Sequence, residues 1–100
     1  MAETVIVEML ENHIGEITLN RPESLNTFTL PLASELNAAL LRLDGESAVR
    51  IIILKGAGKA FCAGIDVGDF FGKSTMEYRD WITCMEAPLE TISRMKKPVM

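Results

Sequence analysis

GAGKAFCAGIDV, residues 56–67, directly follows the most apolar run of the chain, IIIL at residues 51–54. Its glycines, Gly56, Gly58 and Gly64, permit backbone conformations that other residues adopt rarely. A buried strand followed by a glycine-rich turn and a helix start can direct backbone N–H groups toward a bound anion. The stretch therefore predicts an anion or oxyanion site, although the three glycines by themselves also fit plain turns.

The composition fits one soluble globular domain. The 100 residues are 48% hydrophobic and 24% charged, and the net charge is −4. The largest basic cluster is the pair at residues 96–97, which disfavours nucleic-acid binding. No apolar run approaches the length of a membrane-spanning helix, and the acidic N-terminus lacks a signal-peptide pattern. We therefore expect a cytoplasmic protein that binds neither nucleic acid nor a membrane.

The two cysteines, Cys62 and Cys84, lie far apart in the sequence. In a cytoplasmic protein we expect both to be reduced thiols. Together with the single histidine, His13, they do not form a recognisable set of metal ligands. We predict no metal site, and we interpret His13 as a solvated turn residue.

Two short strands open the predicted fold. Residues 4–10 are apolar and β-branched, and residues 14–19 alternate between apolar and polar side chains. Both patterns are typical of strands, and the polar residues between them predict a β-hairpin. Residues 20–27, NRPESLNT, predict a loop, because Pro22 does not fit a central strand and Asn26 favours a turn.

A helix and a third strand follow. Thr29 is a suitable N-cap, Pro31 fits the first helical turn, and leucines at helical spacing extend the pattern to about Leu43. Residues 49–55, VRIIILK, are almost entirely apolar, which predicts a strand buried on both faces of a sheet. A helix followed by such a strand indicates an α/β fold in which helices cover the sheet.

The residues after the glycine-rich stretch predict mainly helix. Residues 65–71 predict a short helical turn, and Ser74 with Glu77 forms a capping-box pattern before a helix over residues 75–95. Pro88 lies inside that helix and predicts a kink or a junction of two helices. An apolar stripe along the helix predicts core packing and comprises Trp81, Met85, Leu89, Ile92 and Met95.

Two nucleotide-binding patterns fail at the glycine-rich stretch. In a P-loop, G-x-x-x-x-G-K-[ST], Gly58 and Lys59 would require glycine at Ile53 and a hydroxyl residue at Ala60. A dinucleotide-binding pattern, G-x-G-x-x-G, would require glycine at Phe61. The sequence therefore indicates no bound nucleotide cofactor.

Two blocks of the sequence resemble the crotonase superfamily of enoyl-CoA hydratases and isomerases. ITLNRPESLNTF at residues 17–28 and VRIIILKGAGKAFCAGIDV at residues 49–67 match the family's I-T-L-N-R-P loop and its G-x-G-x-x-F-x-x-G-x-D pattern. KKPVM at residues 96–100 resembles the family's next strand. The resemblance covers essentially the whole chain. It implies that residues 1–100 are the N-terminal part of one crotonase-like acyl-CoA-binding domain, a spiral of ββα units.

The resemblance also implies a function and a site. Family members bind acyl-CoA thioesters as substrates, without a further cofactor, and stabilise an enolate with two backbone N–H groups. By position, the first is the N–H of Ile65, immediately after Gly64. Loss of such a fixed donor typically costs about 100- to 1,000-fold in rate. The residues implied in coenzyme A binding are Glu23, Ser24, Leu25, Ala63, Ile65, Asp66 and Val67.

The resemblance leaves the reaction open. The family's second oxyanion N–H and its acid/base carboxylates correspond to positions after residue 100, and Glu77, Glu86 and Glu90 lie on a segment that does not match them. Glu23 stands where family members often carry Lys or Arg, so the loop implies no phosphate contact. The resemblance implies a hydratase or an isomerase, as a homotrimer or a dimer of trimers. The alternative is a non-catalytic module that binds coenzyme A esters or a partner subunit.

Overall fold

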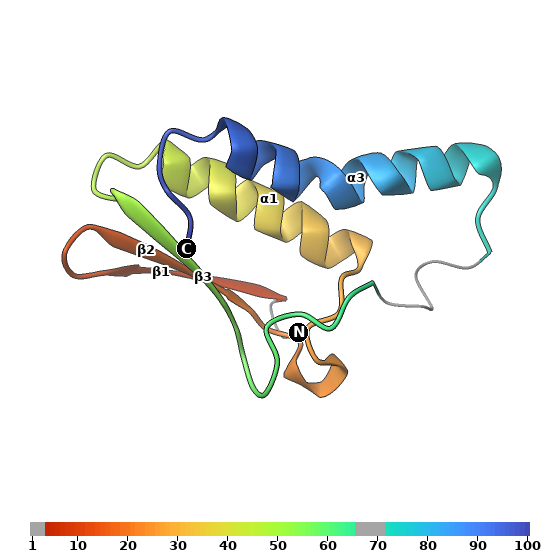
Figure 1. Cartoon of the computed structure of the whole chain (residues 1–100), viewed down its shortest axis with the longest axis horizontal. Helices are drawn as coiled ribbons and strands as arrows, with labels where there is room; N and C mark the ends of the chain where they lie inside the picture. The colour runs from red at the N-terminus through yellow and green to blue at the C-terminus, as the bar shows by residue number, and fades with distance from the viewer. Residues whose placement is uncertain (1–3, 66–71) are drawn as a thin grey trace.

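The computed structural model describes residues 4–65 and 72–100 as a three-stranded sheet with two helices on one of its faces (Figure 1). β1 (Val5–Leu10) pairs antiparallel with β2 (Ile14–Leu19), and β2 pairs parallel with β3 (Ile51–Gly56). The strands follow one another in the sheet as they do in the chain. Among the described residues, no helix is long and apolar enough to span a membrane.

The predicted hairpin between β1 and β2 is confirmed. Asn12 and His13 in its turn have φ values of 62° and 64°, the left-handed conformation that tight hairpin turns require. The carbonyl of His13 accepts hydrogen bonds from the N–H groups of Arg50 (2.7 Å) and Ile51 (3.3 Å), at the start of β3. His13 is an exposed turn residue, as predicted.

Helix α1 (Leu30–Asp44) crosses one face of the sheet. The predicted cap is confirmed, because the hydroxyl of Thr29 accepts the N–H of Leu32 at 3.3 Å. The helix buries a leucine stripe against the odd-numbered residues of β1 and β2 and against Ile52 of β3. Burial of such side chains contributes roughly 1.5–3 kcal/mol each. The core residues of this layer are Val5, Ile17, Leu19, Leu32, Leu36, Ala39, Leu40, Leu43, Val49 and Ile52.

The prediction that β3 is buried on both faces is wrong. Ile52 is fully buried beneath α1, whereas Ile51 on the other face is 38% exposed. Both helices lie on the same side of the sheet (Figure 1), so among the described residues no helix covers the second face. That face also carries the ion pair between Lys55 and Glu16, whose Nζ and Oε1 atoms lie 3.1 Å apart.

Helix α3 (Thr75–Arg94) packs along α1, away from the sheet. Its predicted capping box is present: the Ser74 N–H donates to Glu77 Oε1 (2.9 Å), and the Glu77 N–H donates to Ser74 Oγ (3.2 Å). Pro88 lies inside one continuous helix, so the alternative of two helices meeting there is wrong. The helical turn predicted over residues 65–71 lies outside the described residues except for Ile65.

The apolar stripe predicted for α3 is only partly buried. Trp81 and Met85 pack against Ala33 of α1, and both are almost fully buried. Ile92 and Met95 are partly buried against the main core, but Leu89 is 68% exposed. The stripe is therefore buried at Trp81 and Met85, partly buried at Ile92 and Met95, and exposed to solvent at Leu89.

Residues 98–100 begin a further strand beside β3, as predicted. The Ile52 N–H donates to the carbonyl of Pro98 (3.0 Å), and the Met100 N–H donates to the carbonyl of Ile52 (2.9 Å). Before this strand, Lys97 Nζ donates to the carbonyl oxygens of Leu43 (2.6 Å) and Glu46 (2.5 Å). The lysine thereby satisfies acceptors at the C-terminal end of α1.

Candidate active site

The loop after β2 is folded on itself by Arg21. A short 3-10 helix, η1 (Pro22–Ser24), forms its apex. The guanidinium of Arg21 donates to the carbonyl of Thr27 (2.5 Å) and to Ser24 Oγ (3.4 Å). Arg21 thus shapes the loop, and its guanidinium is hydrogen-bonded within the loop itself.

Asn26 ties this loop to the glycine-rich stretch. Its side chain is fully buried, and its φ of 55° is a left-handed conformation that asparagine tolerates better than most residues. The amide Nδ2 donates to the carbonyl oxygens of Ala57 and Ala60, each at 2.9 Å, while Oδ1 accepts the N–H of Arg21 at 2.7 Å. One bond lies within the loop after β2 and two reach the glycine-rich stretch, so this side chain holds the two loops together.

Gly56 permits the glycine-rich stretch to fold back closely on itself, and Gly58 permits its close contact with the loop after β2. A Cβ on Gly56 would lie 2.5 Å from the carbonyl oxygen of Ala60, inside van der Waals contact. Gly58 has φ +81°, and a Cβ there would lie 2.9 Å from Pro22 Cβ. Both positions therefore require glycine for space, and Gly58 also favours it for its backbone conformation.

The two segments predicted from separate blocks of sequence lie side by side. The N–H of Ala63 donates to the carbonyl of Leu25 (3.0 Å), and the N–H of Phe28 donates to the carbonyl of Gly64 (2.7 Å). Phe28 and Ile65 form an isolated parallel bridge. Residues 25–28 and 63–65 therefore form a short two-stranded junction.

The Gly64–Ile65 peptide is oriented by this junction. In a planar trans peptide the carbonyl and the N–H point in opposite directions. Because the Gly64 carbonyl points to Phe28, the Ile65 N–H points away from Phe28. No acceptor among the described residues receives that N–H. Gly64 has φ +120°, and a Cβ there would meet no described atom within 4 Å, so glycine is favoured by conformation and the described residues leave the adjacent space open.

An apolar cavity of about 400 Å³ lies beside this peptide, between the glycine-rich stretch, β3 and α3. Its volume is typical of a small-molecule site. Glu86 is the only carboxylate or amine side chain among the described lining residues. The lining residues are Leu19, Phe28, Leu36, Leu54, Phe61, Cys62, Gly64, Ile65, Met85, Glu86, Pro88, Leu89 and Ile92.

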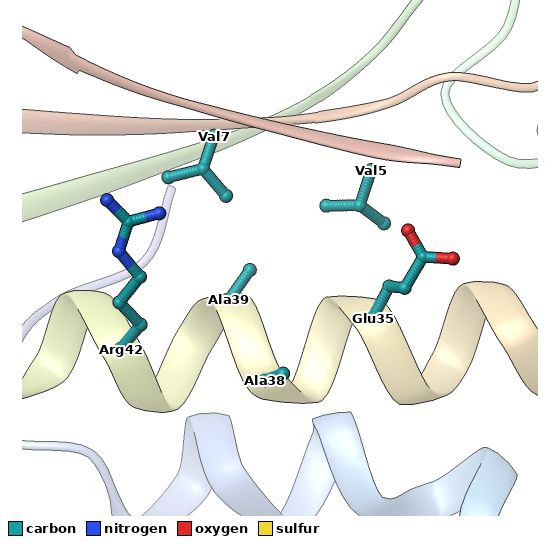
Figure 2. Close-up of a pocket in the computed structure, with 6 residues that line it drawn as sticks. All are labelled: Val5, Val7, Glu35, Ala38, Ala39 and Arg42. Carbon is teal, nitrogen blue, oxygen red and sulfur yellow. The ribbon is translucent and has the colours of Figure 1, made fainter. Parts of the chain in front are cut away.

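A second groove lies between β1 and α1, and none of the predicted site residues lines it. Figure 2 shows Val5 and Val7 projecting from the strand toward α1, with Glu35 and Arg42 extending from the helix at opposite ends. Glu35 accepts a hydrogen bond from the hydroxyl of Thr4 at 2.6 Å. The groove lacks backbone donors fixed by a glycine turn, so the apolar cavity is the better candidate.

The predicted site residues fall into four groups. Gly64 and Ile65 line the apolar cavity. Leu25 and Ala63 are joined by a hydrogen bond, and Ser24 contacts Arg21 in the same loop. Glu23 is exposed at the apex of η1. The last two, Asp66 and Val67, lie outside the described residues.

Sequence reasoning missed two residues of this region. The sequence predicts Asn26 only as a turn residue, and nothing in its local pattern indicates that its amide is buried and hydrogen-bonded. Glu86 was set aside with the other glutamates of its helix, yet it lines the apolar cavity. The sequence signal is that Glu86 lies three residues before Leu89, and residues three apart lie on the same side of a helix.

Both cysteine thiols are free, as predicted. Cys62 lines the apolar cavity, and its Sγ lies 3.8 Å from the carbonyl oxygen of Gly64. Within residues 4–65 and 72–100, no group of three His, Cys, Asp or Glu side chains is placed to hold a metal ion.

The family model and the similar proteins of known sequence point to the same family. Residues 9–100 match the family model described as enoyl-CoA hydratase/isomerase. A probable enoyl-CoA hydratase of Rhizobium meliloti is 36% identical over 98 residues, which cover 98% of this chain and 37% of that protein. The peroxisomal Delta(3,5)-Delta(2,4)-dienoyl-CoA isomerase of Arabidopsis thaliana is 33% identical, with 96% and 39% covered.

A solved structure agrees with these sequences. The crystal structure of enoyl-CoA hydratase from Bacillus anthracis matches with a TM-score of 0.87 and 32% identity, covering 96% of this chain and 38% of that one. The architecture predicted here, the first part of a crotonase-like fold, is confirmed by this match. The chain spans between one third and two fifths of the length of these relatives.

Proposed function

Because the chain belongs to the enoyl-CoA hydratase/isomerase family, we propose that the full-length protein acts on an enoyl-CoA thioester through an enolate held at the Ile65 N–H. Hydration adds water across the double bond, and isomerisation moves a proton between carbons of the acyl chain. Both reactions pass through negative charge on the thioester oxygen. A fixed hydrogen-bond donor at that oxygen lowers either barrier.

The observation that carries the proposal is the orientation of the Gly64–Ile65 peptide. Its carbonyl is engaged by the Phe28 N–H, so its own N–H is directed the other way and finds no acceptor among the described residues. An N–H held by the protein before substrate arrives needs no reorganisation during the reaction. The open space beside Gly64 supports the approach of a thioester carbonyl.

The apolar cavity supports an acyl group as the part of the substrate that is buried. Its floor is formed by side chains that are almost fully buried, including Leu19, Leu36 and Met85. An alkyl chain placed there removes apolar surface from water, which contributes about 0.8 kcal/mol for each buried methylene group. The thioester would then lie at the mouth, next to Ile65.

The coenzyme A part is proposed to run along the junction of the two loops. The side chains of Glu23, Ser24 and Leu25 lie at the η1 end, and Ala63 is tied to Leu25 by its N–H. Asp66 and Val67 are retained as contacts on the strength of the family pattern. The acid/base carboxylates and the second oxyanion donor are expected in residues beyond the present 100.

The test uses the full-length protein and a single-atom change. Replacing residue 65 by its α-hydroxy acid exchanges the N–H for an ester oxygen and leaves the side chain in place. We expect kcat for crotonyl-CoA hydration, or for 3-enoyl-CoA isomerisation, to fall about 100- to 1,000-fold while KM changes little. The same exchange at the exposed Ala48, before β3, serves as the control. An unchanged kcat at residue 65 would remove Ile65 from the site.

Assembly and location are separate proposals. The family resemblance supports a homotrimer or a dimer of trimers, which sedimentation equilibrium of the full-length protein measures. A single-subunit mass would contradict it. A cytoplasmic location stays a prediction, and two Arabidopsis thaliana relatives are named as peroxisomal.

A further inference from the structure

The amide of Asn26 is held in a single orientation where the loop after β2 meets the glycine-rich stretch. The side chain is fully buried, and burial of an amide is unfavourable unless its hydrogen bonds are made. Both amide atoms are bonded, because Nδ2 donates to Ala57 and Ala60 and Oδ1 accepts from Arg21. Among the described residues, no buried side-chain nitrogen or oxygen lacks a partner. The amide therefore acts as a fixed link.

The two carbonyl oxygens that accept from Nδ2 belong to the turn that leads to the Gly64–Ile65 peptide. The N–H of Ala57 donates to the carbonyl of Leu19 at 2.8 Å, so this turn starts from the end of β2. Ala60 lies four residues before Gly64, where the chain leaves the turn toward the apolar cavity. Because one amide bonds to both carbonyls, it fixes the place from which the chain leaves.

The backbone on each side of Asn26 holds the end of the same segment. The carbonyl of Leu25 accepts the N–H of Ala63 at 3.0 Å, and the N–H of Phe28 donates to the carbonyl of Gly64 at 2.7 Å. The amide of Asn26 thus fixes the start of the path to Gly64, and its neighbours in the chain fix the end. Loss of the amide bonds would free the two loops to shift against each other at this peptide.

We propose that Asn26 is a positioning residue whose amide sets the direction of the Ile65 N–H toward the thioester oxygen. This inference rests on the proposed function, because it needs that N–H to be the oxyanion donor. It goes beyond that function by assigning a role to a buried side chain that contacts no substrate. Hydrogen bonds weaken steeply away from a straight geometry, and a misplacement of about 1 Å can cost about 100-fold in rate.

The kinetic test uses N26D in the full-length protein. Aspartate has nearly the same shape, tolerates the left-handed φ of 55°, and keeps an oxygen that accepts the N–H of Arg21. It offers Ala57 and Ala60 no N–H, so the variant removes only the two bonds between the loops. We expect kcat for crotonyl-CoA hydration, or for 3-enoyl-CoA isomerisation, to fall about 10- to 100-fold. KM should change little, because Arg21 still holds the apex of the loop.

A spectroscopic test reads the position of the N–H directly. A hydrogen bond to a thioester carbonyl weakens its C=O bond and lowers the stretching frequency. Infrared difference spectra of butanoyl-CoA with a ¹³C-labelled thioester carbonyl report that frequency in the complex, without any reaction. We expect the wild type to lower the frequency relative to free butanoyl-CoA and N26D to lose most of that shift. A residue that only stabilised the fold would leave the shift unchanged in folded protein.

Two further variants separate positioning from stability. L40A destabilises the core, because Leu40 is fully buried, but Leu40 does not line the apolar cavity. Below its unfolding temperature, L40A should keep the kcat and the infrared shift of the wild type. N26G also lacks both donors and adopts a left-handed φ freely, so it should show the losses of N26D. It covers the case in which N26D does not fold.

The outcomes separate this inference from the proposed function. A wild-type shift and a wild-type kcat in N26D or N26G would overturn the role of Asn26 and leave the proposed function standing. Equal losses in L40A would also overturn it, because the effect would then come from lowered stability. A wild-type complex in which the thioester frequency equals that of free butanoyl-CoA would overturn the proposed function, and this inference with it.

Discussion

The backbone N–H of Phe28 donates to the carbonyl oxygen of Gly64 across 2.7 Å. This bond joins the end of the loop after β2 to the peptide at the mouth of the apolar cavity. It fixes which side of that peptide presents the carbonyl and which presents the N–H.

Replacing Gly64 with alanine should lower kcat of the full-length protein about 10- to 1,000-fold. A φ of +120° is unfavourable for alanine by roughly 1–3 kcal/mol, and no neighbouring atom lies within 4 Å of the new Cβ. The strain is relieved by rotating the Gly64–Ile65 peptide, which misdirects its N–H.

The matched control is Gly72→Ala, where φ is +82° and the Cβ would also meet open space. Gly72 does not line the apolar cavity. Steady-state kinetics should show a large fall in kcat only for G64A. Equal kcat values for the two variants would contradict the role given to the peptide.

Replacing Asn26 with alanine should lower the free energy of unfolding by at least about 2 kcal/mol more than Asn12→Ala does. Both residues have left-handed φ values, 55° and 62°, so both variants lose the conformational tolerance of asparagine. Only Asn26 is buried with three hydrogen bonds, and its loss leaves two carbonyls and one N–H without their partner. Urea denaturation measures the difference; equal values would show that the amide contributes nothing.

Replacing Gly56 with alanine should destabilise the protein by at least about 2 kcal/mol. The new Cβ would lie within 2.7 Å of three backbone atoms of Ala60 and Phe61, and backbone cannot move aside as a flexible side chain can. Gly45→Ala, with its nearest atom at 3.7 Å and a helical conformation, should be neutral or stabilising by up to about 1 kcal/mol. Thermal unfolding that ranks G45A below G56A would refute this reading.

The capping box of α3 should make stability depend on pH in the acid range. The Ser74 N–H and then the Ser74 hydroxyl hold the pKa of Glu77 below its ordinary value of 4.5. Because the folded pKa is lowered, the stabilisation is present above the unfolded pKa and is lost as pH falls through the folded one. An NMR titration should find the Glu77 pKa closer to 4.5 in S74A, and unfolding of E77Q should lose this acid dependence.

The elements that the sequence predicted correctly are those with local causes. Thr29 caps α1 and Ser74 caps α3 through atoms three residues away, so the pattern alone carried the information. The burial of β3 and the exposure of Leu89 depend on which faces other elements cover. The spacing of apolar residues within one element does not show which faces its neighbours cover. Pro88 illustrates the same limit, because packing on α1 keeps the helix continuous through it.

The candidate site was predictable only where the family pattern reached. The resemblance implied a role at the thioester for Gly64 and Ile65; both line the apolar cavity, and their role there stays a prediction. The amide of Asn26 bonds to carbonyls 31 and 34 residues away, a distance at which no sequence motif indicates a partner. The place of Glu86 in the cavity wall is likewise not predictable, because it depends on the packing of α3 beside the glycine-rich stretch.

The order of strands in the sheet has a consequence for how the chain folds. β1, β2, β3 and residues 98–100 lie beside one another in the order in which a ribosome makes them. Each new strand therefore docks on an edge that its predecessor has already formed. The hairpin between β1 and β2 closes a small loop, whereas the parallel pairings join residues far apart in the chain, such as Ile14 with Ile51 and Ile52 with Val99, and therefore form more slowly. β1 and β2 can thus form first and offer the edge on which β3, and then residues 98–100, pair.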